Sequence, residues 1–155
     1  MLEFKIEELK LENLEEAIRV IEITFLKFEA PDYSKEGVES FFEFANYETI
    51  EENLNRNMKM YVAKVNEKIV GVIGYRDNSH INLLFVLEEY QHNGIAKALY
   101  NVVIEKCKDS KTKRVTVNSS PYAHEVYKKF GFVDDNEMHE VDGIKFYQMH
   151  KIFKK

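Results

Sequence analysis

The part of the sequence best suited to chemistry is a polar loop between a buried strand and the clearest helix of the chain. It reads Gln91-His92-Asn93-Gly94-Ile95-Ala96. Its amides fall in the loop and the first helical turn, where N–H groups lack intrahelical acceptors. Such a group of N–H donors at the positive end of a helix is a site for phosphate. Gly94 lets the backbone approach a ligand without a Cβ in the way, although a glycine here is also compatible with a plain tight turn.

The first half of the chain is predicted to supply one strand and three helices around this loop. Residues 4–7 alternate as a strand, and apolar residues at three- and four-residue steps predict a helix that starts after Asn13 and ends at Pro31. Ser34 is placed to cap a second helix, and a third short helix is expected around Ile50.

From Met60 the hydrophobic period changes to that of strands. We expect strands at 61–65, 69–75, 80–86, 114–117, 132–141 and 144–153, and helices at 95–107 and 122–130. The last two strands are expected to meet at Asp142-Gly143, which suits a two-residue hairpin turn. This order predicts an α/β domain of the α+β type, with helices covering a mostly antiparallel sheet over residues 1–155.

Composition excludes several classes of protein. The chain has 155 residues, 45% of them hydrophobic, and only two prolines, so extensive disorder is excluded. No apolar stretch is long enough to span a bilayer, and the charged N-terminus does not suit a signal peptide. The single cysteine, Cys107, falls on the inward side of its helix and is read as a core residue. We expect a cytoplasmic protein without a metal site, because no Cys/His cluster has zinc spacing.

Charge is unevenly distributed along the chain. Residues 1–60 carry 15 acidic and 7 basic side chains, whereas residues 61–155 carry 12 and 15, for a net charge of −5. The acidic total argues against nucleic acid as a partner. The acidic first half is compatible with a cationic ligand, or with ordinary solvated helix faces.

Two motifs resemble the GNAT superfamily of N-acetyltransferases. The loop fits the family's Gln/Arg-x-x-Gly-x-Gly/Ala pattern, and residues 81–86 look like its fourth strand. A second match, Ala-x-x-x-Tyr-x-x-x-Gly-Phe, covers residues 123–132 after a strand ending at Asn118. Leu87 and Glu88 replace a common Asp-Pro pair, and neither change removes a backbone amide.

The resemblance implies a GNAT fold of about seven strands with four to five helices, and transfer of an acetyl group from acetyl-CoA to an amine. Pyrophosphate would bind the loop amides, and pantetheine would run along the backbone of Phe85 and Val86 like an added strand. An N–H group there would hold the oxyanion of the tetrahedral intermediate. Asn118 would bond the pantetheine or a water, or else cap a turn. The implied cofactor-binding residues are Phe85, Val86, Gln91, His92, Asn93, Gly94, Ile95, Ala96 and Asn118.

For catalysis, the resemblance assigns Tyr127 as the acid that protonates the CoA thiolate, with a packing role as the alternative. The amine proton needs an acceptor, for which His80, Glu29 and Asp32 are the candidates, with an ordinary solvated side chain as the alternative for each.

The acceptor is expected to be a small cationic amine or a peptide amine. The residues that select the acceptor are expected within residues 1–60 and in the hairpin at Asp142-Gly143. In the first region, Tyr33, Phe28 and Phe41 are candidates for the acceptor pocket or for the core. Members of the family are often dimers, which makes a homodimer compatible with the resemblance. The competing hypothesis is a non-catalytic acyl-CoA-binding sensor or interaction module on the same fold.

Overall fold

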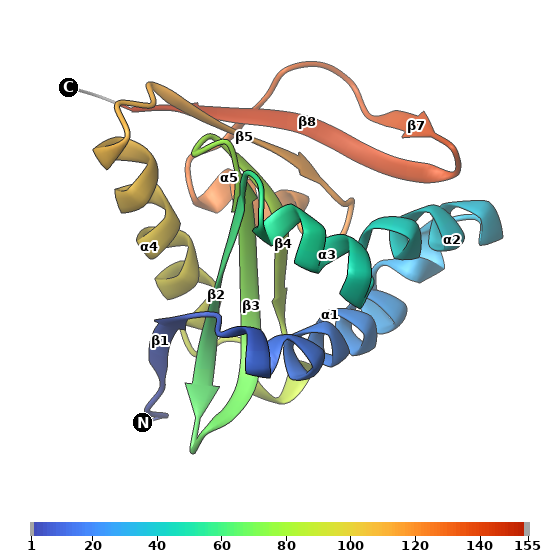
Figure 1. Cartoon of the computed structure of the whole chain (residues 1–155). Coiled ribbons are helices and arrows are strands. Elements are labelled where there is room, and N and C mark those ends of the chain that lie inside the picture. The colour runs from blue at the N-terminus through green and yellow to red at the C-terminus, as the bar shows by residue number, and fades with distance from the viewer. Residues whose placement is uncertain (1, 154–155) are drawn as a thin grey trace.

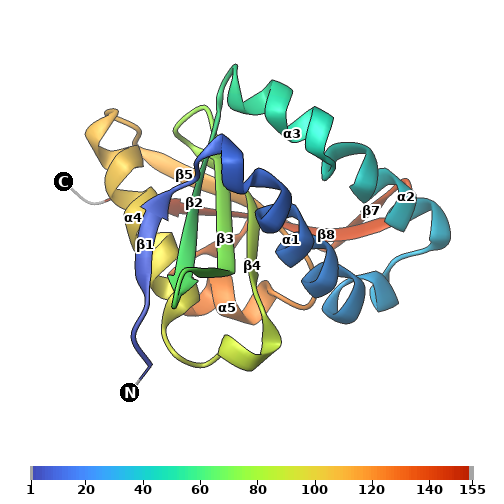
Figure 2. The same ribbon diagram turned by 60° about the horizontal axis from the view of Figure 1, so that its bottom comes forward.

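The computed structural model of the protein describes residues 2–153 and shows a mixed α/β fold, which confirms the predicted class (Figures 1 and 2). The sheet order is β1-β2-β3-β4-β5-β8-β6, and β7 pairs with β8. The strands are β1 Lys5–Glu8, β2 Met58–Val65, β3 Lys68–Arg76, β4 His80–Val86, β5 Arg114–Ser119, β6 Val133–Asp134, β7 His139–Val141 and β8 Ile144–Ile152. The helices are α1 Leu14–Phe28, α2 Lys35–Phe44, α3 Tyr47–Leu54, α4 Ile95–Asp109 and α5 His124–Lys129.

Two helices hold the sheet from opposite faces. From α1, Leu14, Ile21 and Phe25 are fully buried, and from α4, Leu99 and Cys107 are fully buried. Each large apolar side chain removed from water in this way stabilises the fold by about 1.5–3 kcal/mol. Burial also raises the pKa of the Cys107 thiol to about 11, as expected for a core cysteine.

Helix capping follows the sequence only in part. The Ser34 hydroxyl accepts from the Gly37 amide at 3.0 Å and so caps α2. Asn13 precedes α1 as predicted, but its side chain makes no capping hydrogen bond, because the residue ends a 3₁₀ turn, Leu11–Asn13, that runs directly into the helix.

The predicted strand over 132–141 is wrong. Only Val133–Asp134 and His139–Val141 pair with β8, because the polar run after Asp134 has no apolar face to bury. Helix α5 begins at His124 and not at Tyr122, since a turn around Pro121 precedes it.

Strands β4 and β5 form the one parallel pair among the described strands, and they stay together for only two residue pairs. His80 is opposite Thr116 and Ile81 is opposite Val117, after which the strands diverge. Figure 1 shows β5 and β8 running across one end of β2, β3 and β4. The later residues of β4 therefore have a side that no strand covers.

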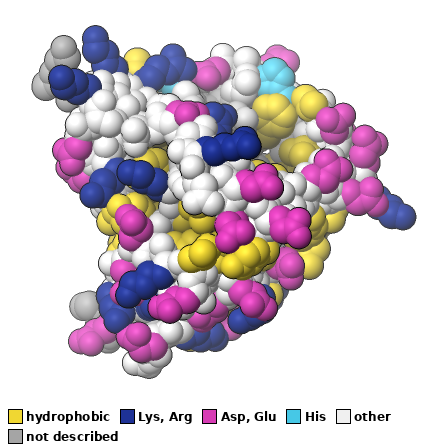
Figure 3. All heavy atoms as spheres, viewed as in Figure 1, with side chains coloured by type: hydrophobic (Ala, Val, Ile, Leu, Met, Phe, Trp, Pro, Cys, Tyr) yellow, Lys and Arg dark blue, Asp and Glu magenta, His cyan; other side chains and the backbone are white. Residues whose placement is uncertain are grey.

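Charge separates over the surface as it does along the chain. In Figure 3, Asp and Glu side chains gather over α1, α2 and α3, and Lys and Arg gather over α4 and the adjacent end of β8. No helix within residues 2–153 has the length and apolar character needed to cross a bilayer.

Candidate active site

The predicted phosphate loop has the geometry of a helix N-terminus exposed to a ligand. Gly94 is the N-cap of α4 with φ +81°, a left-handed conformation that favours glycine. The first helical bond runs from the Ala98 amide to the Gly94 carbonyl at 3.0 Å, so the amides of residues 95–97 precede any intrahelical acceptor. A Cβ placed on Gly94 would meet no atom within 4 Å, which shows that the space in front of the loop is open.

Side chains of the loop fix its shape. Gln91 Nε2 donates to the Val86 carbonyl at 3.0 Å, and Asn93 Nδ2 donates to the carbonyls of Tyr90 at 3.1 Å and Gln91 at 3.0 Å. The loop is thus held by its own amide side chains before any ligand binds.

A cavity of about 300 Å³, called the loop groove here, runs from this loop to the diverging end of β4. Six residues from Tyr90 to Ala96 line it, all but Asn93, whose side chain bonds the loop itself. Across the groove lie Thr24 of α1, Tyr122 and, from α5, Val126. Lys97 adds positive charge at the rim.

The two predicted β4 residues differ in where their main chains point. The Leu87 amide donates to the Val70 carbonyl at 2.8 Å, so these two residues form a hydrogen-bonded pair. Bonded pairs alternate in an antiparallel ladder, which makes Val72 and Phe85 the next bonded pair. The Phe85 amide therefore faces β3, contrary to the expectation that it faces a ligand. The main-chain groups of Leu84 and Val86 face the uncovered side.

A second cavity of about 760 Å³, called the β4–β5 cavity here, lies where the two strands separate. Among the predicted residues, its lining includes Tyr127, His80, Asn118, Tyr33 and Phe41. Asn118 is thus on this side and not in the loop groove. Of the other candidates, Phe28 stacks on Tyr122 at 4.8 Å, and Asp32 is exposed; neither lines the loop groove or the β4–β5 cavity.

The two cavities meet at Glu29, Leu84, Phe85 and Ala123, which line both. Glu29 is 9% exposed. Burial, which disfavours the carboxylate, raises its pKa from 4.5 to about 7, with a smaller opposing effect from the Ser120 side chain. A carboxyl group at the junction that titrates near neutral pH is suited to accepting a proton.

His80 lies at the other end of β4. Its Nδ1 is 2.7 Å from Thr116 Oγ1 across the β4–β5 pair. Burial, helped by the nearby Arg76 charge, lowers the pKa of His80 to about 4, so the ring is neutral at pH 7 and a weak base.

Tyr127 is 3% exposed and projects from α5 to the β4–β5 cavity. Burial and the neighbouring Glu29 charge raise its pKa well above the ordinary value, so the phenol is protonated at neutral pH. Its ring packs edge-on against Phe132 at 5.4 Å, which fixes the side chain. The position of Tyr127 is therefore compatible with both predicted roles, that of a general acid and that of a packing residue.

The β7–β8 hairpin closes one side of the β4–β5 cavity. The Ser34 amide donates to the Gly143 carbonyl at 3.3 Å. A Cβ on Gly37 would lie 2.2 Å from that carbonyl oxygen, so the hairpin tip seats on α2 only because residue 37 is glycine. The sequence indicated the hairpin as a site of acceptor choice, but it carried no signal for the contact with α2.

Sequence reasoning also missed polar residues of this cavity. Ser119 and Ser120 are buried in its wall, and Arg76, Asn53 and Asn57 line its end near His80. These residues come from separate segments and match no motif. Within residues 2–153, no group of three or more His, Cys, Asp or Glu side chains is placed to hold a metal ion.

Residues 29–153 match the family model described as the acetyltransferase (GNAT) domain. The chain belongs to the GNAT acetyltransferase family. It is therefore an acyltransferase, and the fold described above is that of a GNAT enzyme.

Solved structures of this family share the fold. A GCN5-related N-acetyltransferase from Rhodopseudomonas palustris is 18% identical, with a TM-score of 0.84 over 96% of this chain and 95% of that one. The PaiA N-acetyltransferase from Thermoplasma acidophilum, solved with coenzyme A, is 22% identical, with a TM-score of 0.81 over 98% and 100%. A GNAT acetyltransferase from Staphylococcus aureus Mu50 is 24% identical, with a TM-score of 0.76 over 98% and 100%. No curated protein sequence matches the chain.

Proposed function

We propose that this GNAT enzyme transfers an acetyl group from acetyl-CoA to a primary amine by direct attack. The observation that carries the proposal is the junction at Glu29, Leu84, Phe85 and Ala123, where the loop groove meets the β4–β5 cavity. A substrate in each cavity would bring its reacting end to this junction.

Acetyl-CoA would occupy the loop groove. The free amides of residues 95–97 and the open space before Gly94 fit a pyrophosphate. The coenzyme A complex of the Thermoplasma acidophilum PaiA protein supports this choice. The main chain of Val86 and Leu84 would hold the pantetheine as an added strand, and an N–H group there would stabilise the negative oxygen of the intermediate.

The amine would occupy the β4–β5 cavity and lose its proton to Glu29. Its nitrogen forms a bond to the thioester carbon, and the intermediate then breaks its C–S bond. What supports Glu29 over His80 is position and basicity: Glu29 lies at the junction with a pKa near 7, whereas His80 is five residues from Phe85 along β4.

Tyr127 would protonate the departing thiolate. Its proton is retained at neutral pH, and the Glu29 charge acts on it directly. The proton taken from the amine by Glu29 would then restore the phenol of Tyr127.

The test compares the wild type with Tyr127→Phe, using Tyr47→Phe as the matched control because Tyr47 is exposed on α3. Acetyl-CoA at about 100 times its Kd should stabilise all three proteins by about 2.7 kcal/mol in a thermal melt. Thiol release with a panel of amines should fall about 100-fold or more in Tyr127→Phe only, the usual size of a general-acid effect. Stabilisation without thiol release by the wild type would favour the acyl-CoA sensor. Equal turnover in Tyr127→Phe would remove Tyr127 from the mechanism.

A further inference from the structure

The β4–β5 cavity is chemically different at its two ends. At the junction, Glu29 is a buried carboxyl group. At the far end, the lining is rich in hydrogen-bond donors: the Arg76 guanidinium and the amides of Asn53 and Asn57. Between the two ends, Phe41, Leu83 and Val117 give apolar walls.

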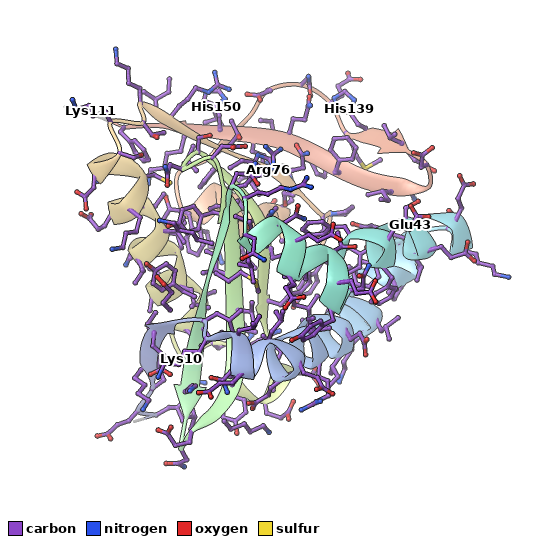
Figure 4. The ribbon with its side chains drawn as sticks, viewed as in Figure 1. Lys10, Glu43, Arg76, Lys111, His139 and His150 are labelled. Carbon is purple, nitrogen blue, oxygen red and sulfur yellow. The ribbon has the colours of Figure 1, made fainter. Side chains whose placement is uncertain are left out.

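Arg76 lies at this far end of the cavity. It is the last residue of β3 and pairs with His80, the first residue of β4. Figure 4 shows it between α3 and β8. Arg76 is among the residues that line the cavity, and its charge helps to lower the pKa of the neighbouring His80.

Arg76 keeps donors for a ligand. Its Nη1 donates to Asp77 Oδ2 at 2.9 Å, and Asp77 also accepts from Asn57 Nδ2 at 2.9 Å. This carboxylate holds the guanidinium by one nitrogen, whereas a guanidinium carries five N–H donors in a fixed plane. The side chain is 47% exposed and accessible to a molecule in the cavity.

We propose that the acceptor is an amine that carries an anionic group at its far end, and that Arg76 binds this group. The inference rests on the proposed function and names its substrate class. Arginine recognises planar carboxylates and phosphates through paired hydrogen bonds, so both anions share the chemistry required.

The sheet sets the length of this acceptor. His80 and Phe85 are five residues apart on β4, which is about 17 Å at the usual strand rise. The arginine side chain can lean along the strand, so this distance is an upper limit. A free α-amino acid carries its amine and carboxylate on one carbon and spans only a small part of this limit, whereas an extended peptide of about five residues spans all of it.

The test measures kcat/KM for alanine peptides of one to about five residues, each with a free or an amidated C-terminus. Amidation removes the charge and keeps the length. ω-Aminoalkyl phosphates, compared with the matching amino alcohols, distinguish a phosphate from a carboxylate. The wild type should prefer the anionic member of a long pair by about tenfold, the lower end for a charged hydrogen bond at a half-exposed site. The preference should disappear for the free amino acid.

Arg76→Gln should remove the preference, and Arg19→Gln is the matched control because Arg19 lies on the outer face of α1, paired with Glu15. Arg19→Gln should keep the wild-type rates, and in Arg76→Gln the charged and amidated members of a pair should react equally. Equal rates for charged and amidated acceptors in the wild type, or a preference that survives in Arg76→Gln, would overturn the inference while leaving acetyl transfer intact. A preference for diamines would also overturn it and indicate Asp142, the other carboxylate of the lining. Absence of thiol release with every amine would instead reject the proposed function itself.

Discussion

The loop groove and the β4–β5 cavity meet at one junction but are built in different ways. The groove takes seven of its sixteen lining residues from the single stretch 90–97 and offers main-chain amides. The cavity takes its lining from α2, α3, β4, β5 and the β7–β8 hairpin and offers side chains. Main-chain donors depend on local conformation, which one glycine and a helix start can fix. Side-chain donors depend on which distant segments the fold brings together.

The cofactor side should therefore tolerate many substitutions, and the acceptor side few. Leu87 and Glu88, which depart from the family pattern, illustrate this: β4 still ends at Val86, and α4 still begins after Gly94. Charge or volume changes in the cavity have no such protection, because the roles proposed for Glu29 and Arg76 depend on their side chains.

The largest effect expected from the acceptor side is that of Glu29→Gln. The variant keeps the volume and removes the base, so kcat/KM should fall by about 10²–10⁴-fold at pH 8. In the wild type, kcat/KM should decline as pH falls through about 7, because Glu29 must be ionised to accept the proton. A pH–rate profile of both proteins checks this, and the same acidic limb in Glu29→Gln would assign the proton to another group.

Stability provides the control for that variant. The pKa of Glu29 is raised on folding, so between about pH 4.5 and 7 the folded protein binds a proton that the unfolded chain releases. The free energy of unfolding of the wild type should therefore fall as pH rises through this window, by at most about 3 kcal/mol from this group. Glu29→Gln should lack this loss. In urea unfolding, its stability relative to the wild type should therefore be higher at pH 8 than at pH 5. Its low activity would then not arise from unfolding.

Sequence could predict the elements that local pattern determines. The helix after Gly94 and the strands around residues 61–86 show clear periods, and the loop motif lies within a single segment. The junction of the two cavities could not be predicted from the sequence, because it depends on where β4 and β5 separate and hydrophobic periodicity does not encode that position. Glu29 was one of three candidate bases, and only its burial beside Ser120 distinguishes it from the exposed Asp32.

The main-chain error at Phe85 has a similar origin. A strand's sequence does not state which of two adjacent amides faces a neighbour, because that depends on the register with β3. Likewise, the seat of Gly143 on α2 joins residues more than a hundred positions apart. Such contacts follow from the fold and cannot be derived from local composition.

On the cofactor side, Gly94→Ala should have a moderate effect. At φ +81° an alanine costs about 1–2 kcal/mol, and its methyl group would enter the open space before the loop. We expect the Kd of acetyl-CoA to rise about tenfold with acceptor KM unchanged. Gly131→Ala is the matched control, because Gly131 also has a positive φ, +98°, and lines neither cavity. It should lower Tm but leave the Kd unchanged, and equal losses of affinity would show that strain alone matters.

The smallest effect tests whether the hairpin contact shapes the acceptor side alone. In a helix, Gly→Ala normally stabilises by about 1 kcal/mol. At Gly37 the new methyl would instead displace the Gly143 carbonyl, which the Cβ position approaches to 2.2 Å. Gly37→Ala should therefore lower Tm and raise acceptor KM a few-fold, with an unchanged Kd for acetyl-CoA because the loop groove has no contribution from α2 or the hairpin. Calorimetry with acetyl-CoA and steady-state kinetics with a fixed amine separate the two. If affinity for acetyl-CoA fell in step with KM, the two regions would be coupled through the junction, and the division between a main-chain site and a side-chain site would fail at the hairpin.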